Sequence, residues 1–304
     1  FRALGAPAGR SLPAMVVAPS SVPRMMAFFS GSWQVGLIAG PVLGGFLYVV
    51  SPSAPFVAAS LLLIVAAILL STLRFHPSAD LRTDERDPSD PSGLRSALDG
   101  LRFVRRTPIL LGAISLDLFA VLFGGAVALL PAIATDRLGV GAVGLGWLRA
   151  AGGIGAATTT AFLAARPLRR RVGAKLFGAV AVFGVATIAL GLTTSYAVAV
   201  AAILVLSAAD AVSVFVRVSI VPLVTPNEVR GRVFAVENVF IGASNELGSF
   251  ESGVAGALFG VSGAVVLGGI ATLVVVGLWC WWFPALRDVD HFGDLTERRA
   301  AGSG

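Results

Sequence analysis

Long stretches that are almost free of charged residues recur along this chain of 304 residues, and no other feature constrains its fold as strongly. A helix needs about 20 mostly apolar residues to cross a hydrocarbon core of about 30 Å. The stretches are much longer than the strands of a membrane β-barrel and do not alternate between apolar and polar residues. We therefore expect eight membrane-spanning helices, at residues 25–49, 54–73, 108–132, 142–165, 173–193, 196–222, 229–259 and 262–284.

The composition also favours a membrane protein. Hydrophobic residues make up 56% of the chain and charged residues 13%, whereas soluble domains are about 25% charged. The chain has a single cysteine, Cys280, and its two histidines, His76 and His291, lie in loops. Neither a disulfide framework nor a metal site is expected, and no GxxxxGK[ST] loop for ATP occurs. We expect the protein to need no cofactor and not to be an enzyme.

Lysine and arginine are distributed unevenly among the loops, and this predicts the orientation in the membrane. Of 23 such residues, 20 lie in segments 1–24, 74–107, 166–175, 225–232 and 285–304, while the opposite loops hold only Arg137. By the positive-inside rule these five segments, with the C-terminus, are cytoplasmic. The net charge of +6 thus follows from topology, and we expect no nucleic-acid partner.

Residues 74–107 differ from the other connections because they are long, highly charged and rich in proline. We interpret them as a cytoplasmic linker in which the sequence LRSALDGLRFVRR forms a short amphipathic helix at the membrane surface.

A weak internal repeat indicates two related halves. When the chain is shifted by 208 residues, MMAFFSGSWQVGLIAGPVLGG at 25–45 falls on VFAVENVFIGASNELGSFESG at 233–253, and Gly40 and Gly45 meet Gly248 and Gly253. Internal repeats of this kind are typical of transporters. With a period of six helices, four helices would precede the first span. We expect the intact protein to have twelve helices and this chain to lack its N-terminus.

The string GLIAGPVLGG, at residues 36–45, contains a candidate element for gating or helix packing: Gly36, Gly40, Pro41, Gly44 and Gly45. Three of these glycines, spaced by four residues, share one helix face where another backbone can approach closely. Pro41 removes a helical hydrogen bond and loosens the helix there. A GxxxG pattern alone is also compatible with generic packing of small residues, whereas the full string is more specific.

This string resembles the antiporter-associated motif in the fifth helix of drug exporters of the major facilitator superfamily. Together with RSLPAMV, RPLRRRVG and TPNEVRGRVFA…GASNELGSFESG, it is similar to the branch that contains enterobactin exporters and macrolide-efflux proteins. The resemblance spans the whole chain, from the end of helix four through helix twelve. It implies an all-α membrane fold of two six-helix bundles, alternating access, and export driven by proton exchange. One departure is Arg166, which stands where the loop motif between helices eight and nine usually has an aspartate, so the gating salt bridge of that motif cannot be assumed.

The resemblance also implies a division of the chain. Residues 1–73 are the remainder of the N-terminal six-helix bundle and 74–107 the linker. Residues 108–285 form the C-terminal six-helix bundle, and 286–304 are a cytoplasmic tail.

Ionisable residues inside the spans are the candidates for the transport pathway, because a charge in hydrocarbon is costly and usually faces a protein interior or a water-filled path. They avoid every third span, at 54–73, 173–193 and 262–284, which the resemblance makes the outer helices. The predicted substrate and proton pathway consists of Asp117, Arg149, Asp210, Asn245, Glu246 and Glu251.

Glu246 is the preferred proton or cation site, because it borders a stripe of small and polar residues at mid-depth. The alternative is a Glu that hydrogen-bonds to a neighbouring helix for packing. Arg217 either faces the cavity with Asp210 or extends to water at its helix end. Arg149 is expected to be a structural partner for an acid, and Glu237 an ion-pair partner near the basic RGR sequence. Trp279, Trp281 and Trp282 are expected to form an interfacial belt.

The function that fits best is secondary active transport, most specifically proton-coupled efflux of an amphipathic small molecule such as a siderophore or a hydrophobic drug of the macrolide kind. An importer or facilitator of the same fold is one alternative, and a non-transporting membrane sensor or scaffold is another. The expected partners are the small-molecule substrate, protons and the lipid bilayer, and the protein is expected to be a monomer. Abundant Ala, Gly and Arg suggest a GC-rich bacterium, and hence a bacterial cytoplasmic (inner) membrane.

Overall fold

The structure is a computed structural model that describes residues 22–72 and 92–295, and these residues contain helices and no strands. The long helices are α2 (Val22–Val50), α3 (Ala54–Ser71), α4 (Ser92–Arg106), α5 (Pro108–Phe123), α7 (Ala142–Ala165), α8 (Val172–Leu192), α9 (Tyr196–Val224) and α10 (Asn227–Trp282). Short elements complete them: α6 (Leu130–Ala132), a π-helix (Ile133–Arg137) and α11 (Pro284–Arg287).

The number of spans is lower than expected when helices are judged by length and apolarity alone. Five described helices could cross a membrane, or six if the bent pair of α4 and α5 forms one span. Two differences explain the lower number. The eight expected spans included α7, whose hydropathy is reduced by Gly, Thr and Arg149, and they counted α10 as two spans. At Gly260, inside α10, the backbone has a positive φ of 73°, so α10 is two helices joined at a kink. This kink lies between the predicted spans 229–259 and 262–284.

The predicted span at 108–132 is wrong in its second half, because α5 ends at Phe123. Gly124 and Gly125 follow, and both are tightly enclosed. A Cβ on Gly124 would lie 2.4 Å from the ring of Phe183, and one on Gly125 would lie 2.4 Å from the hydroxyl of Ser252. The chain therefore turns where α8 and α10 press against it, and continues through α6 and the π-helix.

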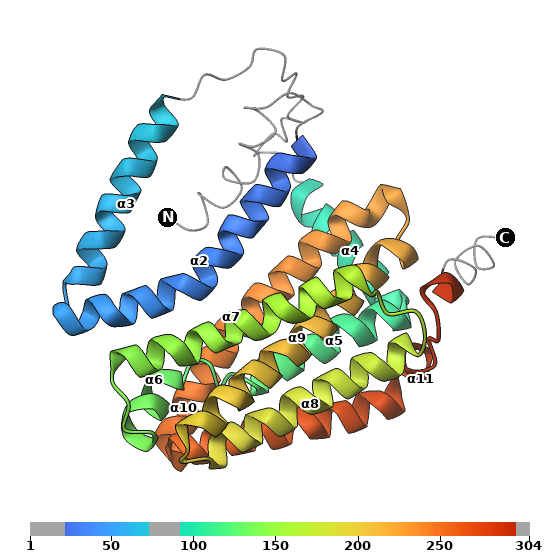
Figure 1. The fold of residues 1–304 in the computed structure, drawn as a ribbon. Coiled ribbons are helices and arrows are strands. Elements are labelled where there is room, and N and C mark those ends of the chain that lie inside the picture. The colour runs from blue at the N-terminus through green and yellow to red at the C-terminus, as the bar shows by residue number, and fades with distance from the viewer. Residues whose placement is uncertain (1–21, 73–91, 296–304) are drawn as a thin grey trace.

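The helices α5 and α7–α10 pack into one bundle, and α2 lies along α7 (Figure 1). Among the described residues, two apolar clusters fill the bundle. One contains Leu110, Leu116, Leu176, Val216 and Ile220, and the other Leu130, Ile133, Leu148, Leu190 and Leu206. The helix α3 buries none of its residues and extends away from the bundle (Figure 1).

The interface between α2 and α7 uses a different face of α2 from the glycine stripe. Gly45 touches the backbone of α7, where an added Cβ would lie 2.5 Å from the carbonyl oxygen of Ala142. Likewise, a Cβ on Gly146 of α7 would lie 2.5 Å from the carbonyl oxygen of Pro41. Gly36, Gly40 and Gly44 have no described atom within 4 Å of such a Cβ. Pro41 and Gly45 thus form the observed contact, and the expected close approach at the other three glycines is absent from the described residues.

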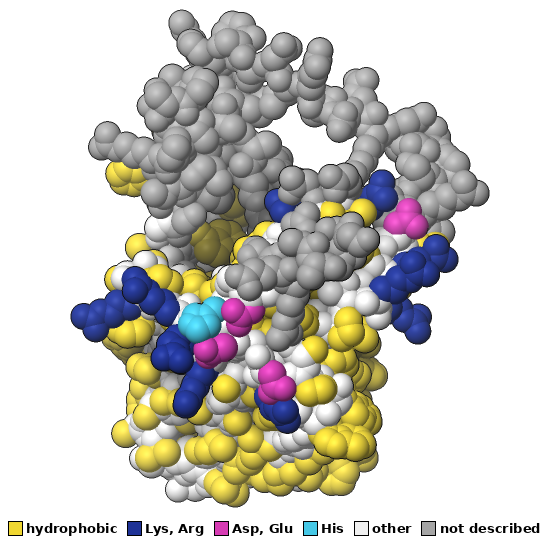
Figure 2. All heavy atoms as spheres, turned by 90° about the vertical axis from the view of Figure 1, so that its right-hand side faces the viewer, with side chains coloured by type: hydrophobic (Ala, Val, Ile, Leu, Met, Phe, Trp, Pro, Cys, Tyr) yellow, Lys and Arg dark blue, Asp and Glu magenta, His cyan; other side chains and the backbone are white. Residues whose placement is uncertain are grey.

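The described parts of the basic segments lie together at one end of the bundle, which we call the basic end. Figure 2 shows Lys and Arg side chains around the rim of this face, with apolar side chains below them. The exposed basic residues at this end include Arg102, Arg105, Arg106, Arg166, Arg169, Arg170, Arg171 and Lys175. Their gathering agrees with the uneven loop charges of the sequence.

The segment after α10 is bound to the start of α8 at the basic end. The backbone N–H of Gly173 donates to Val289 O at 3.0 Å, and the N–H of Arg171 donates to a carboxylate oxygen of Asp290 at 2.7 Å. A Cβ on Gly173 would lie 2.1 Å from the carbonyl oxygen of Leu286, so only glycine fits there. The loop sequence RPLRRRVG therefore ends in a docking point for residues 284–291.

Arg137, the only basic residue of the opposite loops, has a structural role. Its guanidinium donates to the carbonyl oxygens of Gly191, Leu192 and Thr193, at 2.8, 3.2 and 3.2 Å. These carbonyls end α8 and have no partner within the helix. A cation at a helix C-terminus also interacts favourably with the helix dipole.

Candidate functional site

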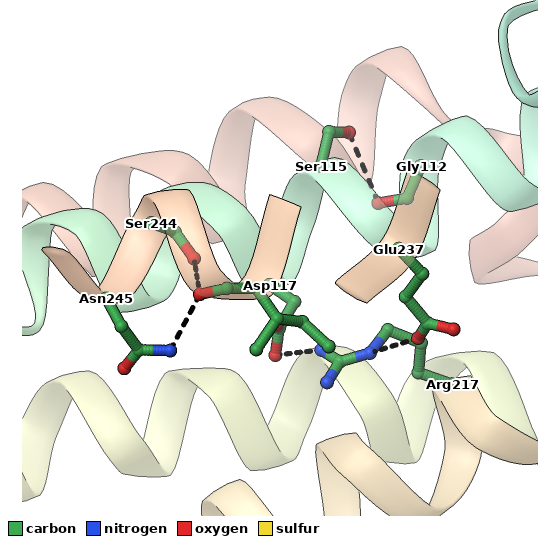
Figure 3. Close-up of polar contacts among 8 residues, drawn as sticks. Gly112, Ser115, Asp117, Arg217, Glu237, Ser244 and Asn245 are labelled. Atoms are coloured by element: carbon green, nitrogen blue, oxygen red, sulfur yellow. Dashed lines mark hydrogen bonds and ion pairs between the residues drawn. The ribbon is translucent and has the colours of Figure 1, made fainter. Parts of the chain in front are cut away.

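Three charged side chains from three helices meet inside the bundle. Arg217 of α9 lies between Asp117 of α5 and Glu237 of α10 (Figure 3). Its Nη1 forms an ion pair with an Asp117 carboxylate oxygen, and its Nε donates to Glu237 Oε1 at 2.9 Å. The three residues are 4–7% exposed. Buried charges are retained in an apolar interior when they are paired and hydrogen-bonded, and Arg217 is paired with both acids and hydrogen-bonded to Glu237.

A fourth charged residue, Asp210, lies near this cluster. Asp117, Asp210 and Ser213 line a cavity of about 10 Å³ whose other walls are apolar, about the volume needed for one water molecule. Asp210 is half-buried and forms no ion pair with a described residue. The predicted pathway residues Asp117 and Asp210 are thus brought together.

The charges of this site do not balance. Asp117, Asp210 and Glu237 face a single described cation, Arg217. Arg217 is shared by two acids, and Asp210 is left without a cationic partner among the described residues. Close carboxylates titrate as a coupled group, because ionising one disfavours ionising the next. The arrangement is chemically suited to taking up and releasing one proton.

Tight contacts between α5 and α10 hold Asp117 and Glu237 in place. Beyond Asp117, a Cβ on Gly248 would lie 2.9 Å from the carbonyl oxygens of Val121 and Leu122. On the other side, the indole N–H of Trp279 donates to the hydroxyl of Ser115 at 2.9 Å. The first contact holds the half of α10 that carries Glu237 against α5, and the second holds the half after the kink at Gly260 against α5.

These contacts decide between the two alternatives for Arg217 and correct the expectation for Trp279. Arg217 does not extend to water at its helix end, because its guanidinium is buried between two acids. Trp279 is not part of an interfacial belt, because it is 8% exposed and hydrogen-bonded to α5. Trp281 and Trp282, at 75% and 55% exposed, have the exposure that a belt requires.

The remaining predicted pathway residues lie outside the cluster. Asn245 is exposed, and its amide donates to the carbonyl oxygen of Ile241 at 2.7 Å, one turn from the site (Figure 3). Glu246 and Arg149 are exposed and form no ion pair with described residues. Glu251 is half-buried on α10. The described residues also contain no group of His, Cys, Asp and Glu that could hold a metal ion.

Sequence reasoning did not place Arg217 and Glu237 at the centre of the site, although a signal was present. Counted from the basic end, Asp117, Arg217 and Glu237 lie roughly 10–15 Å into their helices at a rise of about 1.5 Å per residue. Charges of opposite sign at equal depth in neighbouring helices are natural partners.

A comparison with family models identifies the family of the chain. Residues 1–235 match the model of the Major Facilitator Superfamily. The chain belongs to the major facilitator superfamily. It is therefore a multi-pass membrane transporter, and the family's members are typically not enzymes. No curated protein matches the chain. As a superfamily member it is expected to bind small-molecule substrates within the membrane.

Proposed function

We propose that this superfamily member is a proton-coupled exporter of an amphipathic small molecule, either a siderophore or a hydrophobic drug of the macrolide kind. The observation that supports it is the buried cluster of Asp117, Arg217 and Glu237 with Asp210 beside it. Such a cluster is costly within a membrane and is expected at a proton or ion path.

Asp210 is the proposed site of the coupling proton. It shares the small cavity with Asp117, so a proton on Asp210 relieves the repulsion between the two carboxylates. Loss of that proton restores the repulsion, and the ionised carboxylate of Asp117 then depends more strongly on its ion pair with Arg217. Because Arg217 joins α5, α9 and α10, this change alters the free energy of contacts among three helices.

The substrate class is supported by the resemblance of the glycine string and the loop sequences to drug and siderophore exporters. An importer or facilitator would have the same fold, so the direction of substrate transport has to be measured. The family assignment disfavours a non-transporting sensor or scaffold.

The test uses the intact protein in proteoliposomes that contain a pH-sensitive dye. Two probes are offered, the macrolide erythromycin and a catecholate siderophore. The proposal predicts that at least one probe moves across the membrane and that protons move in the opposite direction. Transport without proton movement would refute the coupling. Failure to move either probe would refute the substrate class.

The proposed location is a bacterial cytoplasmic membrane, with the basic end and the C-terminus in the cytoplasm and the protein acting as a monomer. Cysteines introduced at Ser53, Gly141 and Ser195 should then react with an impermeant reagent added outside, and cysteines at Ser89 and Ser303 should not. Labelling of Ser89 and Ser303 instead of the other three positions would overturn the orientation.

In the proposed division of the chain, residues 108–285 form one helical bundle and residues 1–73 belong to the other.

A further inference from the structure

The helix α4 crosses the basic end of the bundle. Its part Leu98–Arg106 is bent by 106° from α5, which follows after Thr107. Because α5 runs along the bundle through the apolar core, we expect α4 to lie roughly parallel to the membrane surface, near the lipid headgroups. Figure 1 shows it at the end of the bundle, beside the start of α10.

One face of α4 is fixed to the bundle. Val104 is 1% exposed and belongs to the apolar core. Gly100 lies against α10, where an added Cβ would be 2.8 Å from the carbonyl oxygen of Arg232. The side chain of Arg232 also pairs with Asp99 at 3.6 Å. These contacts fix which face of α4 points outward.

The outward face combines positive charge with an apolar surface. Leu98, Arg102 and Arg105 are exposed and lie one turn apart, opposite Gly100 and Val104. A hollow of about 650 Å³ lies over this face, lined by Leu98, Asp99, Leu101, Arg102, Arg105 and Arg106. Asp99, the one acid among its described lining residues, is paired with Arg232. The three arginines of the hollow form no ion pair with a described acid.

This combination matches a lipid with a negative headgroup. A guanidinium binds phosphate oxygens through two parallel hydrogen bonds. Clusters of basic residues beside a membrane helix attract anionic lipids, and an exposed leucine beside them offers a surface for an acyl chain. We propose that the hollow is a binding site for an anionic phospholipid, with Arg102, Arg105 and Arg106 on the phosphate and the exposed Leu98 on the acyl chain.

A second basic hollow at the same end provides a matched comparison. It has a volume of about 440 Å³ and is lined by Ala165, Arg166, Pro167, Arg169, Arg170 and Lys175. Its described lining residues carry at least as much positive charge but include no large apolar side chain, and they lie between α7 and α8 rather than on α4. We expect it to attract anions without selecting a lipid.

The test is native mass spectrometry of the intact protein in mild detergent, with phosphatidylglycerol and phosphatidylcholine of identical acyl chains added in equal amounts. The wild-type protein should retain mainly phosphatidylglycerol. The triple variant Arg102→Gln/Arg105→Gln/Arg106→Gln should lose that retention by about tenfold or more. The control Arg166→Gln/Arg169→Gln/Arg170→Gln removes the same charge and should retain the lipid as the wild type does.

Two single variants test the proposal even if the triple variant fails to fold. Arg105→Gln and Leu98→Asn each change one exposed side chain, and each should weaken phosphatidylglycerol retention at an unchanged unfolding temperature. Undiminished retention in both would overturn the proposal. Equal loss in the two triple variants would mean general attraction between charges. Displacement of the lipid by excess inorganic phosphate would mean a site for free anions instead.

Discussion

The Nε of Arg217 lies 2.9 Å from Oε1 of Glu237, and both side chains are 5% exposed. The two residues come from α9 and α10, and the second acid on the same guanidinium, Asp117, comes from α5. A single arginine therefore joins three helices of the bundle inside its apolar core. The cluster is at once a structural contact and the place where charge can change.

Removing the cation should destabilise the fold. Arg217→Gln leaves Asp117 and Glu237 buried without a positive partner, which costs about 3–5 kcal/mol for a broken buried pair. Its thermal unfolding temperature in detergent should fall clearly below that of the wild type. The double variant Arg217→Gln/Glu237→Gln removes one of the abandoned charges and should recover part of the loss. A wild-type unfolding temperature for Arg217→Gln would contradict the burial of the pair.

The two ends of the glycine string should respond differently to a large side chain. Gly45→Leu would push against the backbone of α7 at Ala142 and should lower the stability of the protein. Gly40→Leu meets no described atom within 4 Å of its Cβ and should leave the unfolding temperature unchanged. Equal effects of the two variants would show that the contact between α2 and α7 differs from the one described.

The arginine at the end of α8 should be needed for stability. Arg137→Ala removes the guanidinium donor of three carbonyl oxygens at the end of α8, of which only that of Gly191 keeps another donor among the described residues, the hydroxyl of Ser262. Each hydrogen bond to a charged group contributes about 1.5–3 kcal/mol at most. The unfolding temperature should therefore fall, and Arg137→Lys should restore part of it. Arg149→Ala, at an exposed residue without an ion pair among the described residues, is the matched control.

Docking of the segment after α10 can be tested by limited proteolysis. Asp290→Asn keeps the size of the side chain but weakens its bond to the N–H of Arg171. Residues 284–295 should then be cleaved faster than in the wild type. Asp136→Asn, at the opposite end of the bundle, should not alter cleavage. Unchanged cleavage of Asp290→Asn would mean that the backbone hydrogen bonds alone hold the segment.

Most of the helical framework could be predicted from the sequence, because hydrocarbon tolerates only long apolar helices. The limits of α7, α8 and α9 lie within two residues of the predicted spans at 142–165, 173–193 and 196–222. The end of α5 could not be predicted in this way. Gly124 and Gly125 end it through contacts with Phe183 and Ser252, which are distant in sequence.

The candidate site was predicted only in part for the same reason. Asp117 and Asp210 were recognised because an acid at mid-depth needs a protein or water partner. The identity of that partner depends on which helices are neighbours, and a helical wheel of one segment does not contain this information. Glu246 lies at mid-depth as expected, yet its side chain is exposed and away from the cluster around Arg217.

The most direct test of proton coupling compares Asp210→Asn with Glu246→Gln in proteoliposomes of the intact protein, with proton movement recorded during erythromycin or siderophore transport. Asp210→Asn breaks no described ion pair, so the variant should fold normally, with its unfolding temperature as the control. Asp210→Asn should abolish proton movement and transport against a gradient, and Glu246→Gln should retain both. Full proton movement in Asp210→Asn, together with its loss in Glu246→Gln, would contradict the assignment and return the coupling proton to Glu246.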